Sequence, residues 1–439
     1  MEIIGVGGYE EVGRNMTLFR SGEDAIIIDM GIRLDRVFIH EDTDLNRLSH
    51  KELAEKGIIP DDSVIKSFRS KIKAIVLSHG HLDHLGAVSI IAKKYPSAPI
   101  IGTPYTIELV KKEFRGKCQN PIYTLVAGEV LQISRDMSIE FVKVTHSIPD
   151  VVALVVHSNE GKFLYMNDFK LDDNPIIGEP PDYARLKELG KEGVKLMVIE
   201  TTRVAREGRT PSESIARYLL KDTIKKSDSD AGLIVTTFSS HIARIQSAVD
   251  SAKEQDRVPM LLGRSMEKYV GIAERTGIIS LPDNARIYGA QKSITKVLNK
   301  IAKGGREEYM LIITGHQGEP DALLSKIVKH KYDFRIAKGD NVVFSADIIP
   351  NPINLAQRYA LETKLNMQGA RIFKGAHVSG HAAREDHRDI IKMVKPENIV
   401  PTHGTLEMLA IYAELAESEG YTLNKNLYLI RNGQRVEVR

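Results

Sequence analysis

Residues 78–86 read SHGHLDHLG and directly follow the apolar run IKAIVL at 72–77. Three histidines and an aspartate fall within six positions, namely His79, His81, Asp83 and His84. Where a strand runs into a tight turn, side chains two apart share a side, so the first two histidines can aim at one place. Imidazole and carboxylate groups are ligands that zinc accepts. A segment as short as 79–84 cannot easily give four ligands to one ion. The cluster therefore predicts two ions about 3.5–4 Å apart.

Three further polar side chains follow strand-like runs elsewhere in the chain. His146 ends IEFVKVTH, Asp168 follows GKFLYMN, and His403 follows NIVPT. Asp168 is the best candidate to bridge two ions, because a carboxylate has two oxygens, and each histidine can complete one ion. An isolated histidine at a strand end is usually a surface residue. The hypothesis of a metal site therefore depends on the cluster at 79–84.

Two other acidic residues end apolar runs. Asp29 follows the hairpin-like stretch TLFRSGEDAIII, and Glu200 ends VKLMVIE. Either residue can be a helix cap or an exposed charge. Either can also accept a hydrogen bond from a ligand histidine and so fix its orientation. The sequence leaves both interpretations open.

Composition narrows the class of protein. The 439 residues suggest two or three domains, and 42% apolar with 27% charged residues is typical of a globular protein in water. Cys118 is the only cysteine, which excludes an intrachain disulfide and a thiolate zinc site. We expect a cytoplasmic protein without membrane association. The 61 Lys and Arg barely exceed the 58 Asp and Glu, so a nucleic-acid partner would need locally concentrated positive charge.

The pattern of predicted strands and helices changes twice along the sequence. Residues 1–205 read as many short strands, residues 206–369 alternate strands with helices, and residues 370–439 return to the first pattern. The middle part predicts a parallel α/β domain inserted into the first domain. TPSE at 210–213 predicts a capping box, with Thr210 as the N-cap and Glu213 reaching back. Residues 34–70 are polar and loop-like with a short helix, and we assign them no role.

The order of these motifs resembles the metallo-β-lactamase fold. The inserted segment before SGHA (379–382) and PTHG (401–404) resembles the β-CASP branch of nucleic-acid hydrolases. Within that branch, residues 1–439 resemble ribonuclease J, in particular the short archaeal kind. The resemblance implies an α/β protein, a metallo-β-lactamase αββα sandwich with an inserted parallel α/β β-CASP domain. Asn167, where the family tends to have glycine, and His316, where bacterial members tend to have serine, depart from the family pattern.

The resemblance also implies roles for individual residues. One zinc would be held by His79, His81, His146 and Asp168, and the other by Asp83, His84, Asp168 and His403. Asp29 matches the first motif of the family. Glu200 would orient His381, which is the residue we expect to protonate the leaving 3′-oxygen. Mn²⁺ or Mg²⁺ are possible substitutes for the two zinc ions.

Candidate RNA contacts lie in and after the inserted segment. TFSSHIAR at 237–244 puts Ser239 and Ser240 before a helix, where they either bind phosphate or simply cap the helix. By resemblance, His377, Ser379, Gly380 and His381 would form a pocket for a 5′-monophosphate. The basic run KIVKHKYDFRIAK at 326–338 is either a phosphate track or a solvated helix face.

The resemblance implies hydrolysis of RNA phosphodiesters by a zinc-activated water. We expect a processive 5′→3′ exoribonuclease that prefers single-stranded RNA with a 5′-monophosphate and acts in RNA decay or maturation. The alternatives are an endoribonuclease with the same metal site and, from another class, a catalytically inactive RNA-binding protein. Inactive proteins are expected to lose ligands, and every ligand position is filled here. We further expect a homodimer, with a higher homo-oligomer as the alternative.

Overall fold

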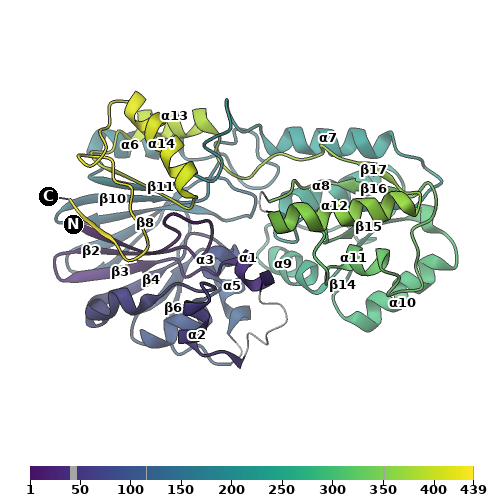
Figure 1. Ribbon diagram of the computed structural model, residues 1–439, viewed down its shortest axis with the longest axis horizontal. Helices are drawn as coiled ribbons and strands as arrows, with labels where there is room; N and C mark the ends of the chain where they lie inside the picture. Colours follow the sequence, from purple (N-terminus) through teal and green to yellow (C-terminus); the bar gives the residue numbers. More distant parts are fainter. Residues whose placement is uncertain (40–46, 115, 350–351, 439) are drawn as a thin grey trace. The chain divides into compact units, whose positions relative to one another are not determined.

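The computed structural model describes residues 1–39, 47–114, 116–349 and 352–438, and it contains two compact units (Figure 1). Unit 1 is formed by Met1–Asp172, Pro180–Thr210 and Gly380–Arg439, and unit 2 by Asp173–Glu179 and Pro211–Ser379. The domain boundaries expected from sequence stay predictions. Among the described residues, no helix combines the length and apolar character that a membrane span requires.

Unit 1 contains two sheets. The first has the strand order β19 (Arg435–Glu437), β1 (Glu2–Gly7), β2 (Met16–Ser21), β3 (Asp24–Ile28), β4 (Ile72–Val76), β5 (Ile100–Gly102) and β6 (Ile122–Thr124). The second has the order β18 (Ile399–Thr402), β11 (Leu196–Glu200), β10 (Gly161–Met166), β9 (Val152–Ser158), β8 (Met137–Lys143) and β7 (Val130–Ser134). The first is antiparallel from β19 to β3 and parallel from β3 to β6.

The two sheets of unit 1 share an apolar core. Phe19 of β2 and Phe163 of β10 stack with ring centroids 4.6 Å apart, and the strands around them contribute buried Ile, Val, Leu and Phe side chains. The outer face of the second sheet is covered by α6 (Tyr183–Glu192), α13 (Arg384–Val394) and α14 (Leu406–Ser418). Helix α5 (Pro104–Glu113) contacts the first sheet at β5 and β6. The order of layers is therefore helix, sheet, sheet, helix, as expected.

LGAVSIIAKKY at 85–95, directly after the histidine cluster, has the pattern of one helix, but the structure differs from this prediction. This part of the chain forms three short pieces, α3 (Leu82–Leu85), α4 (Val88–Ile91) and the 3₁₀ turn η3 (Ala92–Lys94). Gly86 lies at the break, where an added Cβ would come within 2.5 Å of the Leu82 carbonyl oxygen. Residues 34–70 form α1 (Leu34–Ile39), α2 (His50–Glu55) and most of the 3₁₀ segment η2 (Asp62–Lys71), while positions 40–46 lie outside the described residues.

Unit 2 contains one fully parallel sheet with helices. Its strand order is β14 (Arg286–Tyr288), β13 (Val258–Leu262), β15 (Tyr309–Ile313), β12 (Leu233–Thr236), β16 (Asn341–Phe344) and β17 (Arg371–Phe373). Its helices are α7 (Glu213–Lys225), α8 (Ile242–Glu254), α9 (Arg264–Arg275), α10 (Gln291–Ala302), α11 (Leu323–Val328) and α12 (Pro352–Met367). Strand β17 falls in the predicted closing segment 370–439, yet it pairs with β16 and extends this sheet. Strand β14 and helix α10 were not anticipated from the sequence.

The predicted capping box at TPSE is wrong. Helix α7 begins at Glu213, its N-cap is Ser212, and the Ser212 hydroxyl accepts a hydrogen bond from the Ser214 amide. The Glu213 carboxylate does not reach back, because it is paired with the guanidinium of Arg244 instead (2.7 Å). Thr210 donates its hydroxyl hydrogen to the carbonyl oxygen of His381 (2.7 Å).

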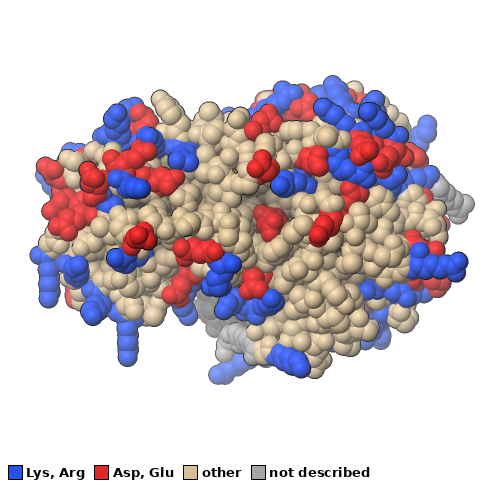
Figure 2. All heavy atoms as spheres, turned by 180° about the vertical axis from the view of Figure 1, so that it is seen from behind, with Lys and Arg blue, Asp and Glu red and all other residues tan. Residues whose placement is uncertain are grey.

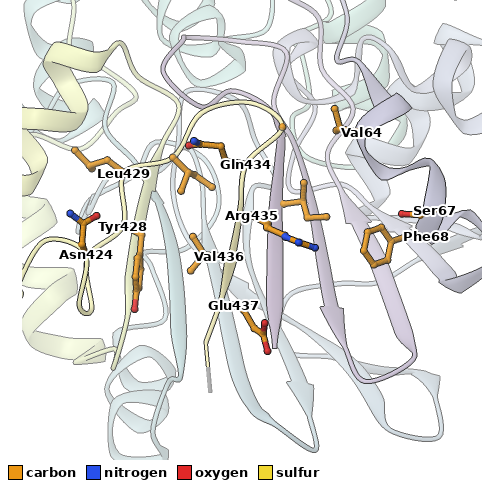
Figure 3. A pocket seen from close by; sticks show the side chains of 13 residues that line it. Val64, Ser67, Phe68, Asn424, Tyr428, Leu429, Gln434, Arg435, Val436 and Glu437 are labelled. Carbon is orange, nitrogen blue, oxygen red and sulfur yellow. The ribbon is translucent and has the colours of Figure 1, made fainter.

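A hollow of about 750 Å³ lies in unit 1 between η2 and the last strand (Figure 3). Phe68 and Ser67 border it on one side, and Val436 and Glu437 of β19 border it on the other. None of the seven predicted ligand residues lines it. This hollow is therefore separate from the chemistry described next.

Candidate metal centre

Strand ends and one short helix place all seven predicted ligands in unit 1. His79 follows β4, His81 is the N-cap of α3, and Asp83 and His84 lie within α3. The other three are His146 in the loop after β8, Asp168 just after β10, and His403 directly after β18. His403 has a left-handed backbone with φ of 52°, as has Asp29 with φ of 61°. Such strain in non-glycine residues is common at functional sites.

The first group of ligand atoms consists of three histidines and one oxygen of Asp168. Nδ1 of His81 lies 3.2 Å from Nε2 of His79 and 3.1 Å from Nε2 of His146. Oδ2 of Asp168 lies 3.5 Å from Nε2 of His79 and 3.4 Å from Nε2 of His146. Four potential donor atoms from three separate segments therefore converge on one point, within 4.8 Å of one another.

The second group uses the other oxygen of the same aspartate. Oδ1 of Asp168 lies 3.5 Å from Nε2 of His84 and 3.3 Å from Nε2 of His403. Oδ2 of Asp83 lies 3.8 Å from the first of these nitrogens and 3.5 Å from the second. Asp168 thus presents one oxygen to each group, which is the arrangement that a carboxylate shared by two cations requires.

The donor set fits metal ions. Oδ1 of Asp168 is buried and has no hydrogen-bond partner among the described residues, and such orphaned acceptors are costly unless something binds them. Burial, together with neighbouring histidines, holds the pKa of His81 well below 6.5, and burial does the same for His146. Both rings are therefore neutral at pH 7. A neutral imidazole has a free lone pair, which a metal ion needs.

Asp29 orients one of the predicted ligands, His84, through a hydrogen bond. It is fully buried, and its Oδ2 accepts a hydrogen bond from Nδ1 of His84 (2.8 Å), which leaves Nε2 of that ring directed at the second group. The carboxylate also accepts from the amide and hydroxyl of Ser78 and from the hydroxyl of Tyr165 (3.2 Å). Of the two interpretations left open by the sequence, this geometry supports orientation of a ligand.

Two contacts near the second group were not anticipated from the sequence. Nδ2 of Asn15 lies 3.0 Å from Nε2 of His84, so a donor points at the lone pair that a metal would take. The amide of Gly13 points at Nδ1 of His403 (3.3 Å). Both residues belong to the loop between β1 and β2, where VGRN carries no motif for metal binding. Only the fold brings this loop to the site.

Glu200 and His381 form a buried pair beside the ligands. Nδ1 of His381 lies 3.0 and 3.1 Å from the two carboxylate oxygens of Glu200. Burial would raise the pKa of Glu200, but His381 outweighs it and lowers that pKa to about 2. Burial would likewise lower the pKa of His381, but Glu200 and Asp168 outweigh it and raise that pKa to about 9. The ring is therefore an imidazolium at neutral pH, with 24% of its side chain exposed.

The SGHA segment approaches the metal ligands closely at Gly380. The carbonyl oxygen of Gly380 accepts a hydrogen bond from Nδ1 of His146 (2.7 Å). A Cβ at position 380 would come within 2.7 Å of the Cβ of Ser147, so only glycine fits this contact. The same peptide therefore orients His146 and precedes His381.

The remaining predicted RNA contacts lie in unit 2. Ser239 and Ser240 are partly exposed in the turn before α8, and the side chain of the N-cap residue, His241, does not accept a hydrogen bond from the first turn of this helix. His377 is partly buried and Ser379 is buried, both after β17. The roles of these four residues stay predictions.

The buried guanidinium of Arg244 holds the loop that carries His377 and Ser379. Arg244 is completely buried and donates to both carboxylate oxygens of Glu213 (2.7 and 3.0 Å). It also donates to the carbonyl oxygens of Ser345 (2.7 Å) and Ala376 (3.1 Å) and lies 3.2 Å from Nδ1 of His377. One side chain therefore links α7, the end of β16 and the loop after β17. No sequence motif pointed to it.

Three family models match separate parts of the chain. Residues 63–205 match the beta-lactamase superfamily domain, and residues 230–358 match the ribonuclease J beta-CASP domain. Residues 369–428 match the RNA specificity domain of Zn-dependent metallo-hydrolases. The expected fold class is thus confirmed.

Full-length relatives give the same answer. The chain is 54% identical to ribonuclease J of Methanocaldococcus jannaschii, over 99% of this chain and 98% of that protein. It is 51% identical to ribonuclease J of Pyrococcus abyssi, over 100% of this chain and 97% of that protein. A crystal structure of a protein of unknown function from Enterococcus faecalis V583 superposes with a TM-score of 0.67 at 16% identity, covering 99% of each chain, and shows the shared fold alone. The chain therefore belongs to the ribonuclease J family of metal-dependent RNA hydrolases.

Proposed function

We propose that this protein is a two-zinc 5′→3′ exoribonuclease that prefers RNA with a 5′-monophosphate. The observation that carries the metal stoichiometry is the division of Asp168 between two ligand groups, with one oxygen facing each group. The first ion would be held by His79, His81, His146 and Asp168, and the second by Asp83, His84, Asp168 and His403. When bound, zinc supplies a nucleophile at neutral pH and offsets the charge that develops on the phosphoryl oxygens.

His381 is the proton donor in this proposal. Its Nδ1 faces Glu200, so its Nε2 would carry the proton that moves to the leaving 3′-oxygen. The Glu200 carboxylate is held by the amides of Phe169 (3.3 Å) and Thr202 (3.1 Å), which keeps the imidazolium in one orientation. Glu200 is therefore a positioning residue, and His381 touches the substrate.

The preference for a 5′-monophosphate rests on the segment 377–381. It contains two histidines, a serine and a glycine, and Arg244 fixes the loop in which it begins. A terminal phosphate bound by this segment would leave the first phosphodiester as the one attacked. Ser239 and Ser240 would contact the strand further along.

One assay distinguishes 5′→3′ exonuclease cleavage from endonuclease cleavage. A 5′-monophosphorylated RNA labelled at its 5′ end should release labelled mononucleotide from the earliest times, while a 5′-triphosphorylated copy should resist. Discrete internal fragments from both substrates would instead show an endonuclease with the same metal centre. His81→Ala should abolish cleavage, with the partly exposed His157→Ala of unit 1 as the matched control.

The remaining expectations have direct tests. Metal analysis of the purified protein should give two zinc ions per chain, and Mn²⁺ or Mg²⁺ should be tested as substitutes in the apo-protein. A chain that binds no metal would favour the inactive RNA-binding alternative. Light scattering should give the mass of a homodimer. We also propose a cytoplasmic location, which fractionation of the source cells tests.

A further inference from the structure

Positive charge is concentrated in one part of unit 2. Between residues 286 and 340 there are eleven Lys or Arg against six Asp or Glu. The other 50 Lys and Arg are outnumbered by 52 Asp and Glu, so this part carries the whole excess of the chain. Over the face drawn in Figure 2, by contrast, charges of both signs are interspersed with uncharged surface. Local excess of this kind is the usual sign of a polyanion site.

Three of these lysines line one hollow. It has a volume of about 410 Å³ and is bordered by Lys326, Lys329 and Lys331, with Gln291, Pro320, Asp321 and Tyr332 completing its wall. Lys326 pairs with Asp321 at 3.1 Å, but this carboxylate is 95% exposed, and such pairs are weak and easily exchanged. Within the described ranges, neither Lys329 nor Lys331 pairs with a carboxylate.

The hollow is built on a fixed scaffold. Nε2 of Gln291, the first residue of α10, donates to the hydroxyl of the buried Tyr332 (2.7 Å). Further along the helix, Asn299 donates to Asp333 (2.9 Å). These contacts hold α10 beside the segment that follows α11, and both helices are labelled in Figure 1. The turn at His330 has a left-handed φ of 60°, and exposed lysines flank it on both sides.

Helix α10 extends the positive surface beyond the hollow. Its inward face consists of the buried Ile294, Leu298 and Ile301. Lys292, Lys296 and Lys300 recur every four residues and are exposed, as expected for the opposite face of an amphipathic helix. Gln291, which lines the hollow, directly precedes this row of lysines on the same helix.

We propose that this lysine surface, formed by Lys292, Lys296, Lys326, Lys329 and Lys331, is an auxiliary site for the sugar–phosphate backbone of single-stranded RNA. It lies wholly in unit 2, whereas every predicted metal ligand lies in unit 1. Ammonium groups on flexible stems make contacts to phosphate that do not depend on the base, so the site would be independent of sequence. Long RNAs would engage it, and short ones that fill only the catalytic site would not. The proposal rests on RNA being the substrate, and it does not depend on the direction of cleavage.

The test is a charge-neutralising triple variant, Lys326→Gln/Lys329→Gln/Lys331→Gln, of the zinc-loaded enzyme. Its kcat and KM are measured on a six-nucleotide and a forty-nucleotide RNA with the same 5′ end. We expect about a tenfold higher KM for the long RNA, with kcat and the short substrate unaffected. The slope of log kcat/KM against log salt for the long RNA should become shallower by about 2, because each lost phosphate contact contributes about 0.7.

The matched control is Lys225→Gln/Lys253→Gln/Lys364→Gln, which removes three exposed lysines of unit 2 outside the surface. The proposal is overturned if the long RNA keeps its KM and salt slope in the first variant, or if the control changes them as much. An acidic protein partner would leave the kinetics of both RNAs unchanged and is thereby distinguished. Internal cleavage of both RNAs would overturn the proposed exonuclease and leave this comparison intact.

Discussion

Both units bury a cluster of charged and imidazole groups, and the two clusters differ in what they leave unsatisfied. In unit 2, the Arg244 guanidinium is surrounded by the Glu213 carboxylate and by backbone carbonyls, so the protein itself supplies every partner. In unit 1, ring nitrogens of His79, His81 and His146 face one another across about 3 Å, and an oxygen of Asp168 is left without a donor. The first arrangement is complete without a ligand, and the second requires one. The candidate site is therefore distinguished by several ligand atoms that converge on one point without a donor between them, and buried charge alone does not distinguish it.

The largest effect should come from the shared ligand. Asp168→Asn removes the carboxylate that faces both groups, so RNA cleavage should fall by at least about 10³-fold and bound zinc should drop below two ions per chain. Cleavage kinetics and metal analysis by mass spectrometry measure this. The exposed Asp136→Asn serves as the control. Full zinc content in Asp168→Asn would show that the two groups do not share this residue.

The next largest effect is expected on stability, at the Arg244–Glu213 cluster of unit 2. Arg244→Met removes the guanidinium that donates to both oxygens of the buried Glu213 carboxylate, and it should lower the free energy of unfolding by about 3–5 kcal/mol. The double variant Glu213→Gln/Arg244→Met should lose much less, because no uncompensated charge remains. Urea unfolding measures both, and zinc content should stay unchanged. Equal losses in the single and double variants would contradict the idea that the carboxylate is the source of the cost.

A smaller effect is expected at Asp29, which hydrogen-bonds to the predicted ligand His84. Asp29→Asn keeps a hydrogen bond to Ser78 but weakens the hold on Nδ1 of His84, so zinc affinity should fall by about 10–100-fold. Competition with a chelator measures the affinity. Ser63→Ala, at an exposed position of unit 1, provides a reference that leaves all predicted ligands intact. Unaltered affinity in Asp29→Asn would make Asp29 a purely structural residue.

The smallest effect depends on pH. Burial lowers the pKa of His387 from 6.5 to about 4, and neither ring nitrogen has a hydrogen-bond partner among the described residues. Between these two values the unfolded chain binds the proton and the folded chain does not, so stability is lost as the pH falls through this window. His387→Leu should remove the loss, gaining about 1 kcal/mol over the native chain between pH 7.5 and 5.5. Urea unfolding at both values tests this, and a pH-independent difference would contradict the assignment.

The sequence predicted the site best where several ligand-type residues lie close together in the chain. HGHLDH at 79–84 has little meaning except as a ligand cluster, and from it the isolated His146, Asp168 and His403 acquire a role. Strand ends could be predicted because apolar runs stop there. The contacts of Asn15 and Gly13 could not, because the loop between β1 and β2 reaches the site only through sheet pairing.

Local signals also failed where a distant partner intervenes. Glu213 has the spacing of a capping residue, but Arg244 is 31 positions away and takes its carboxylate. The segment 85–95, whose local pattern favours one helix, instead forms short pieces that begin after Gly86. At Glu213 the tertiary contact overrides a correct local preference.

The pairing of β1 with β19 has a consequence for the order of assembly. Strand β1 hydrogen-bonds along Glu2–Ile4 with residues 435–437, and the nitrogen of Met1 donates to the carbonyl oxygen of Val438 (3.0 Å). Synthesis of the whole inserted unit separates these two strands, and His381 and His403 are also made after it. A nascent chain that has emerged only to residue 379 therefore lacks His381, His403 and strand β19, which pairs with β1. The candidate site therefore cannot be complete until the residues that follow the inserted unit have been made.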